Sequence, residues 1–329
     1  YKRQGAGQVA AENGRLTLEA IFSPDPATRI EFSGSPLTDL EWSVDGHAYL
    51  QPANSQDEEK TFSPPLRVEV RTGHEKPLFD SATLVEALEK LESFTAQDAR
   101  NLGHDEVSLS PLQDALLIQH TGDLFHVSLR TGSARRLTRG PDTEELARFS
   151  PDGQWVAFVR QHDLYVTRIG NSQETALTAD GVPSLLNGKL DWVYQEEIYG
   201  RGDFKAYWWS PDSRFLAFLQ LDESPVHEFT LVDHLPTRSR TEVVHYPKAG
   251  DPNPKVRLGV VAVTGGPITW VDTNRYQKSD HLIVRVGWTP DSQQVVYLVQ
   301  DREQTWLDIN LADRDRGRGT TLVHETSPA

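Results

Sequence analysis

A short turn motif that returns five times constrains the fold more than any other feature of this sequence. Each copy has an aromatic or apolar residue, Ser or Thr, usually Pro-Asp, a turn residue and an alternating apolar strand. Proline presets the backbone for a turn and Asp-Gly or Asp-Ser closes it, so each copy predicts a β-hairpin. The hydroxyl residues of the five copies are Ser43, Ser110, Ser150, Ser210 and Thr289, at intervals of 67, 40, 60 and 79 residues.

The predicted strands after these turns are Ala48–Leu50, Ala115–Ile118, Trp155–Val159, Phe215–Leu219 and Val295–Val299. A repeated hairpin with an aromatic residue before the turn is typical of β-propeller blades, which take about 40–50 residues each. One interval fits a bare blade, and the others leave room for insertions. We predict an all-β fold in which residues 1–329 form a β-propeller domain or a large part of one. The alternative is a set of generic hairpins in a β-sandwich.

One stretch interrupts the strand pattern. Residues 80–94 predict a short helix, because Ser81 can cap it and Leu84, Leu88 and Leu91 fall on one face. We expect this helix to pack over the edge of a blade. A helix that binds a partner is the alternative.

Composition excludes several classes of function. The net charge of −15 repels phosphate backbones, so nucleic acid is not an expected partner. No apolar run is long enough to span a membrane, and the absence of Cys removes disulfides and thiolate metal sites. The 11 His residues are scattered without zinc-binding spacing and no phosphate-binding glycine loop occurs, so we predict no metal and no cofactor. The chain begins at Tyr1 without an initiator Met, so we interpret it as a piece of a longer protein.

An acidic motif lies between the third and fourth hairpin signals. Residues 191–200 read Asp-Trp-Val-Tyr-Gln-Glu-Glu-Ile-Tyr-Gly and do not alternate like a strand, so we expect a short helical or looped excursion from a blade. Two adjacent carboxylates, Glu196 and Glu197, suit a primary ammonium, which has three donors and one positive charge. The α-ammonium of a peptide amino terminus is a candidate ligand for such a pair. The alternative is an exposed acidic turn in an acidic protein.

Two further motifs have simpler interpretations. Arg201-Gly202-Asp203 spells an adhesion tripeptide, but we predict a turn beside the acidic motif. The charged run at residues 313–319 predicts a solvated hairpin tip that needs no partner.

The acidic motif and its neighbours resemble the propeller of the dipeptidyl peptidase IV family, within the prolyl-oligopeptidase-like serine peptidases. The resemblance rests on residues 191–200, on Ala206-Tyr207-Trp208-Trp209-Ser210-Pro211-Asp212, and on Tyr246-Pro247-Lys248-Ala249-Gly250 with Asn253-Pro254 and the strand Val256–Val261. It covers nearly the whole chain. The paired Glu residues and the Tyr-Pro-Lys-Ala-Gly stretch are far more specific than the hairpin repeat.

The resemblance implies an eight-bladed propeller above an α/β-hydrolase domain that removes dipeptides after Pro or Ala. It assigns Glu196 and Glu197 to the substrate α-ammonium, with Trp192, Tyr194 and Tyr199 as supporting residues. No Gly-x-Ser-x-Gly nucleophile motif occurs here, so we predict no catalytic residue in this chain and a hydrolase domain downstream. The family's second-blade Arg has no match near Gln119.

The implied partners are peptide amino termini, the chain's own hydrolase domain and a second copy in a homodimer. The implied location is periplasmic or secreted. The alternative function is a non-catalytic propeller, WD40-like or TolB-like, that acts as a protein-binding scaffold. Ser-Pro-Asp-Gly hairpins occur in both classes, whereas a scaffold needs no paired Glu residues flanked by aromatic side chains.

Overall fold

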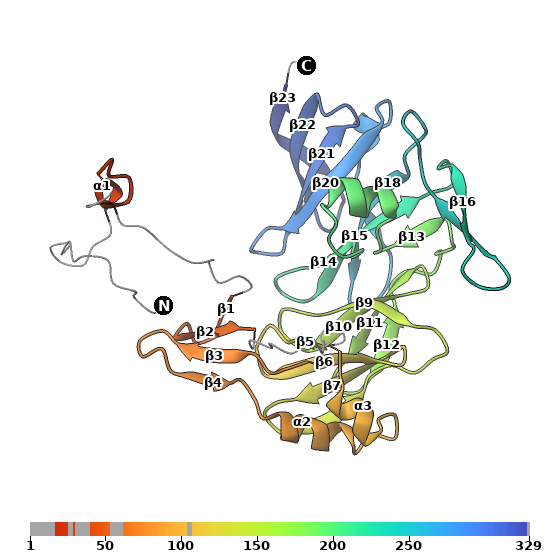
Figure 1. The fold of residues 1–329 in the computed structure, drawn as a ribbon. Helices are drawn as coiled ribbons and strands as arrows, with labels where there is room; N and C mark the ends of the chain where they lie inside the picture. The colour runs from red at the N-terminus through yellow and green to blue at the C-terminus, as the bar shows by residue number, and fades with distance from the viewer. Residues whose placement is uncertain (1–16, 26–28, 30–39, 53–61, 104–106, 328–329) are drawn as a thin grey trace.

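The computed structural model of the chain describes residues 17–25, 29, 40–52, 62–103 and 107–327. These residues form five antiparallel sheets that follow one another in sequence, plus a separate two-stranded hairpin (Figure 1). The sheets are propeller blades, and each of the five predicted turns joins two neighbouring antiparallel strands of one blade. The all-β prediction is therefore confirmed.

The first three blades have four strands each. Blade one comprises β1 (Glu41–Trp42), β2 (Ala48–Gln51), β3 (Leu66–Glu69) and β4 (Glu75–Pro77). Blade two comprises β5 (Val107–Leu109), β6 (Ala115–His120), β7 (Asp123–Ser128) and β8 (Ser133–Arg136). Blade three comprises β9 (Glu144–Phe149), β10 (Trp155–Arg160), β11 (Asp163–Arg168) and β12 (Gln173–Ala176).

Blade four carries the insertions that lengthen its repeat. It comprises β13 (Leu185–Asn187), β14 (Tyr207–Trp209), β15 (Phe215–Asp222), β18 (Lys255–Ala262) and β19 (Thr269–Trp270). The hairpin of β16 (Glu228–Asp233) and β17 (Arg240–His245), which we call the arm, leaves the blade between β15 and β18. Blade five comprises β20 (His281–Trp288), β21 (Gln294–Asp301), β22 (Trp306–Asp313) and β23 (Gly319–Thr326).

The described helices are all short. They are α1 (Leu18–Ile21), α2 (Ser81–Leu88), α3 (Ala96–Arg100), the π-helix η3 (Tyr194–Ile198) and the 3₁₀-helix η4 (Asn274–Tyr276).

The predicted helix at residues 80–94 is shorter than expected. Asp80, not Ser81, is the N-cap, because its carboxylate accepts the Ala82 N–H. The helix ends at Leu88, and a capping box of Thr95 and Asp98 begins α3. The prediction that the helix packs on a blade is confirmed: Leu84 and Leu88 are buried against blade two, and Leu91 packs on the same cluster from the following turn.

The repeated turns are built alike. In blade three the Ser150 hydroxyl donates to the Asp152 carboxylate at 2.6 Å and accepts the Trp155 N–H at 3.0 Å. Ser210 does the same in blade four. The third residue after each hydroxyl residue has a left-handed backbone, with φ between 56° and 69°, at Gly46, Gln113, Gly153, Ser213 and Ser292.

The left-handed residue of one turn often bonds to the turn before it. Ser213 of blade four accepts the Asp152 N–H of blade three at 3.0 Å, and Ser292 of blade five accepts the Asp212 N–H of blade four at 3.0 Å. Gln113 of blade two accepts the Val44 N–H of blade one at 3.3 Å. These hydrogen bonds explain why a side chain, rather than glycine, occupies three of the five strained positions.

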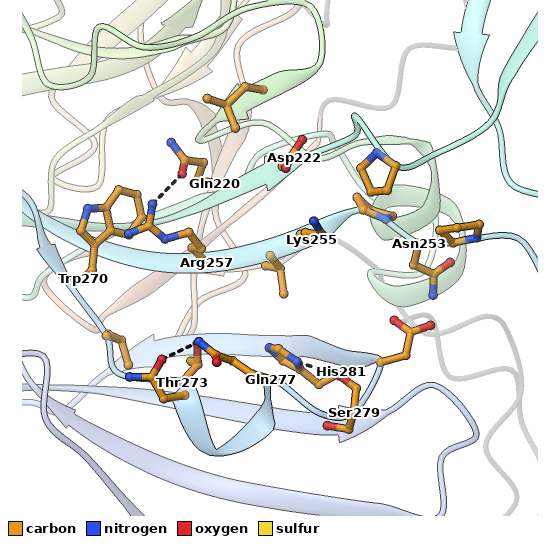
Figure 2. Close-up of a pocket in the computed structure, with 18 of the residues that line it drawn as sticks. Gln220, Asp222, Asn253, Lys255, Arg257, Trp270, Thr273, Gln277, Ser279 and His281 are labelled. Atoms are coloured by element: carbon orange, nitrogen blue, oxygen red, sulfur yellow. Dashed lines mark hydrogen bonds between the residues drawn. The ribbon is translucent and has the colours of Figure 1, made fainter.

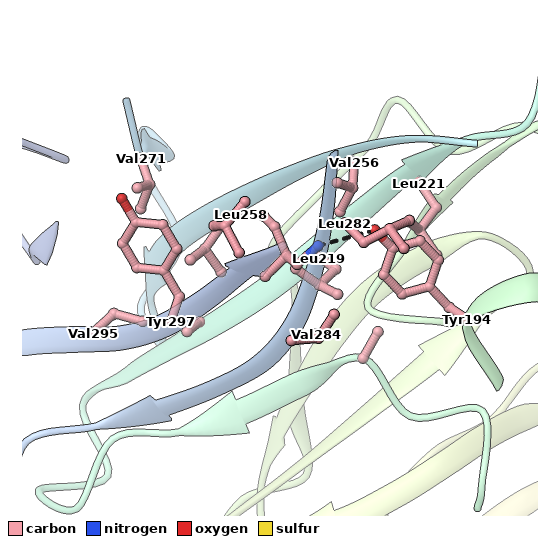
Figure 3. Close-up of a cluster of buried hydrophobic side chains, with 14 of the residues drawn as sticks. Tyr194, Leu219, Leu221, Val256, Leu258, Val271, Leu282, Val284, Val295 and Tyr297 are labelled. Carbon is pink, nitrogen blue, oxygen red and sulfur yellow. Dashed lines mark hydrogen bonds between the residues drawn. The ribbon is translucent and has the colours of Figure 1, made fainter. Parts of the chain in front are cut away.

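The cores lie between consecutive blades. Phe149 and Phe158 of blade three pack with Leu117 and Leu124 of blade two, and Phe218 of blade four packs with blade three. The largest cluster joins blades four and five, as Figure 3 shows, through residues such as Leu219, Leu258, Leu282 and Tyr297. Burial between sheets therefore holds the blades in order.

The charged run forms the connection between β22 and β23, as predicted, but it is not fully solvated. The Arg314 side chain is only 13% exposed, stacks on the Phe215 ring of blade four at 4.3 Å and donates to the Ser292 carbonyl. Gly317 is buried, and a Cβ there would collide with the Trp270 carbonyl oxygen. The tip therefore also packs against the preceding blade.

Candidate functional site

Residues 191–200, which we call the Glu segment, leave blade four between β13 and β14. The expected helical excursion is present: residues 192–193 begin a helical turn that continues as η3. The Tyr199 N–H donates to the Tyr194 carbonyl at 2.8 Å, which is the wide i→i+5 bond of a π-helix. Single π-turns are rare and concentrate at functional sites.

Asp191 fixes the start of the Glu segment. Its carboxylate accepts the Val193 N–H at 3.1 Å and the Tyr194 N–H at 3.0 Å. The side chain is buried, and burial raises the pKa of this carboxyl, although the two N–H donors act in the opposite direction. Asp191 therefore supplies the cap that the first helical N–H groups need.

Tyr194 anchors the segment in the core between blades four and five. The side chain is fully buried, and its hydroxyl accepts the Ile283 N–H of β20 at 3.2 Å, the dashed line in Figure 3. Burial raises the pKa of this hydroxyl well above its usual value, so it stays protonated. The anchor is 89 residues away from its partner in sequence.

Tyr199 and Trp192 attach the segment on two other sides. The Tyr199 ring lies 6.2 Å from the Trp208 ring and 5.3 Å from the Arg285 guanidinium, which also donates to the Ile198 carbonyl. The Trp192 ring lies 4.3 Å from the Tyr246 ring, just beyond β17 of the arm. The three aromatic residues named as supporting are thus contacts between the Glu segment and its surroundings.

The two Glu side chains have different environments. Glu196 is 25% exposed, and its Oε1 lies 2.7 Å from Nε of Arg201. Glu197 is exposed and has no hydrogen-bond or ion-pair partner among the described residues. One carboxylate is therefore held in place by an ion pair, and the other is exposed to solvent.

The adhesion-like tripeptide is a turn, as predicted, and it folds back on the Glu segment. Arg201 has a left-handed backbone with φ of 61°, and its N–H donates to the Gln195 carbonyl at 2.9 Å. The Gln195 amide donates in return to the Gly202 carbonyl at 2.8 Å. Asp203 pairs with Arg148 of β9, so the turn also contacts blade three.

A pocket of about 890 Å³ lies between β18–β19 and the connection that contains η4. Figure 2 shows its mixed lining, in which the Arg257 guanidinium stacks 3.7 Å above Trp270 and donates to Gln220. Because Glu196 and Glu197 do not line it, the pocket is not the site that the acidic motif predicts.

Two further features are absent from the described residues. They contain no group of three or more His, Cys, Asp or Glu side chains that could hold a metal ion. No helix in the described part of the chain is long and apolar enough to cross a membrane.

Sequence reasoning missed three residues near the Glu segment. Arg201 was recognised only as part of a tripeptide, although an Arg four or five residues after a Glu pair is a signal for a local ion pair. Glu223 and His245 lie 3.7 Å apart at the root of the arm. No local pattern joins those two, because an inserted hairpin separates them.

The comparisons with known proteins agree with this architecture. Residues 114–329 match the family described as "Dipeptidyl peptidase IV (DPP IV) N-terminal region". A probable dipeptidyl-aminopeptidase B of Phaeosphaeria nodorum is 32% identical over 61% of this chain and 23% of its own length. A probable dipeptidyl peptidase 4 of Neosartorya fischeri is 35% identical over 49% of this chain and 22% of its own length. The chain thus spans less than a quarter of these relatives.

Solved structures show the same fold. Dipeptidyl peptidase 4 of Porphyromonas gingivalis superposes with a TM-score of 0.71 at 22% identity, covering 88% of this chain and 40% of the other. A putative dipeptidyl aminopeptidase IV of Bacteroides ovatus gives a TM-score of 0.66 at 20% identity, covering 89% of this chain and 38% of the other. By the match to residues 114–329, the chain belongs to the dipeptidyl peptidase IV N-terminal-region family.

Proposed function

We propose that this chain is the substrate-gating propeller of a serine-type dipeptidyl aminopeptidase, and that Glu196 and Glu197 bind the α-ammonium of the peptide. The observation that carries the proposal is the unequal Glu pair on a π-turn that is anchored at several points. An ammonium needs several acceptors and one net negative charge. With Arg201 paired to Glu196, the three charged groups sum to a single negative charge, which matches one ammonium.

In the proposed mechanism, the site sets the distance between the substrate's amino terminus and the bond that is cleaved. A clamp that holds the ammonium at a fixed distance from a nucleophile on a linked α/β-hydrolase domain would present only the bond after the second residue. Binding energy made away from the scissile bond would then be used for orientation. Preference for Pro or Ala at the second position would reside in the hydrolase domain, which we propose lies downstream in the full-length protein.

The test compares free and blocked substrates in the full-length protein. An Ala-Pro p-nitroanilide should be cleaved, whereas its N-acetyl form should not, because acetylation removes the charge. Glu196→Gln and Glu197→Gln should each lower kcat/KM by the equivalent of about 2–4 kcal/mol. Glu325→Gln, an exposed position on β23, is the matched control. Equal activity in all three variants would refute the clamp, and a protein with no peptidase activity would favour the scaffold alternative.

The exposed apolar side chains of the arm support a further proposal, that a second copy of the chain is a partner in a homodimer. A two-stranded hairpin is marginal by itself, yet this one exposes the apolar side chains of Phe229, Leu231 and Val243, and Leu235 at its tip is 96% exposed. A second copy of the chain would cover them. Leu231→Asp should then shift the full-length protein toward monomer in light scattering, and an unchanged mass would argue against the arm as the contact.

We also propose that the protein is exported to a periplasm or to the cell exterior, where peptides with free amino termini are its substrates. Cell fractionation with an antibody against this chain would test the location.

A further inference from the structure

The pocket beside β18 borders an open edge of the blade four sheet. β19 pairs only with residues 259–260 of β18, so residues 255–258 have no strand on the side away from β15. The chain after β19 turns toward blade five instead, where the Asp272 N–H donates to the Gly317 carbonyl at 2.8 Å. The pocket is lined both by the first half of β18 and by the chain that follows β19. It therefore lies where a longer β19 would run.

The backbone of Val256 faces this open edge without a partner. The Leu258 carbonyl accepts the Val271 N–H at 2.9 Å, whereas Leu219, which pairs with Leu258 in register, directs its own N–H away from β18 to the Ala206 carbonyl. Residues two apart in a strand direct their N–H and C=O groups to the same side, so those of Val256 point to the pocket. No turn, loop or side-chain hydrogen bond among the described residues reaches either group. Val256 is only 5% exposed, and buried backbone groups are nearly always paired, so a partner is missing here.

Two cationic side chains flank Val256. Lys255 and Arg257 lie on one face of β18, and both are exposed and line the pocket. The Arg257 guanidinium stacks on Trp270 at 3.7 Å and donates to the Gln220 amide oxygen at 3.3 Å (Figure 2). Gln220 is buried, and its own amide donates to two further side chains. Stacking uses the face of the guanidinium and leaves N–H groups at its edge, so Arg257 is held in place with donors to spare.

The acidic residues of the pocket do not neutralise these cations. Neither cation has a carboxylate within ion-pair distance among the described residues, although three carboxylates line the same pocket. Asp280 pairs with Arg302 at 3.2 Å. Asp222 and Asp272 each accept the backbone N–H two residues further on, at 3.0 Å. Two unpaired positive charges therefore face one pocket in a protein of net charge −15, which favours an anionic ligand.

We propose that this pocket binds a short extended peptide segment that carries a carboxylate. The segment pairs as a strand with the Val256 backbone, and its carboxylate pairs with Arg257 and Lys255. Adding a strand to a sheet edge supplies main-chain hydrogen bonds, and the edge of a guanidinium binds a carboxylate through two parallel N–H bonds. Pro252 and Pro254 lack the N–H that longer pairing needs, so the segment is short.

This site is separate from the ammonium clamp and does not depend on it. Glu196 and Glu197 do not line the pocket. A ligand with no amino-terminal charge should therefore still bind here.

The experiment measures binding of N-acetyl-Ala-Ala-Ala to the full-length protein by isothermal titration calorimetry. Acetylation removes the ammonium charge, so the proposed clamp does not contribute to the measured affinity. The carboxy-terminal amide of the same peptide lacks the carboxylate and should bind about tenfold more weakly. Methylation of the central peptide nitrogen removes one main-chain donor and should weaken binding about fivefold.

Variants of the two cations test the other side of the contact. Arg257→Gln should weaken binding about tenfold, and Lys255→Gln about threefold, because an ammonium offers a point charge rather than a fork of donors. Arg257→Lys keeps the charge without the fork and should fall between wild type and Arg257→Gln. Arg318→Gln removes an exposed cation outside the pocket and is the matched control, with unchanged affinity. If Arg257→Gln does not fold, Lys255→Gln and the peptide series carry the test.

A second peptide distinguishes two sources of the carboxylate. N-acetyl-Ala-Asp-Ala amide carries its charge on a side chain. Tighter binding of this peptide assigns the site to an acidic side chain, and tighter binding of N-acetyl-Ala-Ala-Ala assigns it to a free carboxy terminus. Equal affinities for the acid, the amide and the aspartyl peptide, an unchanged affinity in Arg257→Gln, or no binding of any of them overturns the proposal. A normal KM in Glu196→Gln bears only on the clamp.

Discussion

The Glu segment precedes β14 of blade four and the hairpin turn at Ser210 follows it. Different kinds of contact hold the two in place. In the turn at Ser210 the hydroxyl bonds to residues two and five positions away. In the Glu segment, Tyr194 bonds to Ile283 and Ile198 bonds to Arg285, each almost 90 residues distant. The hydroxyl bonds of the turn join residues that are close in sequence, whereas the Glu segment also needs bonds to residues that are distant in sequence. The conformation of the turn thus depends on residues near it in sequence, and the conformation of the Glu segment depends on residues far from it in sequence.

The largest expected effect is at the anchor of the Glu segment. Tyr194→Ala should lower the free energy of unfolding by about 3–5 kcal/mol, because it leaves a cavity in the core between blades four and five. Urea denaturation measures the loss. Tyr194→Phe, which removes only the bond to the Ile283 N–H, should cost about 1–3 kcal/mol. If both variants were as stable as wild type, the Glu segment would not depend on distant contacts.

The next effect depends on pH. The folded-state pKa of Glu223 is about 7, raised from 4.5, so between these values the folded state binds more protons than the unfolded state. Stability should therefore fall as the pH rises from about 4.5 to 7, by on the order of 2–3 kcal/mol from this group. Urea midpoints at pH 5 and pH 8 measure the change, and Glu223→Gln should abolish most of it. A stability that rises over this interval in wild type alone would contradict the assignment.

Disrupting a single hairpin turn should destabilise the protein less than removing the Tyr194 side chain. Ser150→Ala removes the acceptor of the Trp155 N–H and the donor to Asp152, and should destabilise the protein by about 1–2 kcal/mol. Because both of these hydrogen bonds stay within the turn of Ser150, KM should not change. A shift in KM comparable to that of the Glu variants would show that turns and site are not independent.

The smallest effect on stability is expected at Arg201. Its side chain is 77% exposed, and exposed ion pairs contribute about 0–1 kcal/mol, so Arg201→Gln should barely change the urea midpoint. Its effect should appear in KM instead, because Glu196 loses the partner that orients it. Arg318→Gln, which removes the same charge from an exposed position outside the Glu segment, is the matched control. Equal KM in wild type and Arg201→Gln would show that Glu197 and Glu196 bind without this partner.

The sequence predicted most of the architecture because each turn is a local device. All five predicted strands exist, and each is extended by one or more residues, as in Phe215–Asp222. The helix at residues 80–94 is shorter than predicted, because the leucine spacing continues through Leu91 although the helix ends at Leu88 and turns lead from it to a new cap at Thr95. The Glu segment was recognised from its composition and its family resemblance. Its π-turn and the Glu223–His245 contact were not predicted, since both depend on residues brought together by the fold.

The bond between successive turns has a consequence for how such a chain can grow. The turns of blades one, three and four each donate a backbone N–H to the repeat that follows, and Gln113, Ser213 and Ser292 are the acceptors. A duplicated hairpin of this kind would carry both halves of the joint with it, so it could be inserted without a new connector. A blade that has both the donor and the acceptor, as blade four does, can bond to a copy of itself on either side.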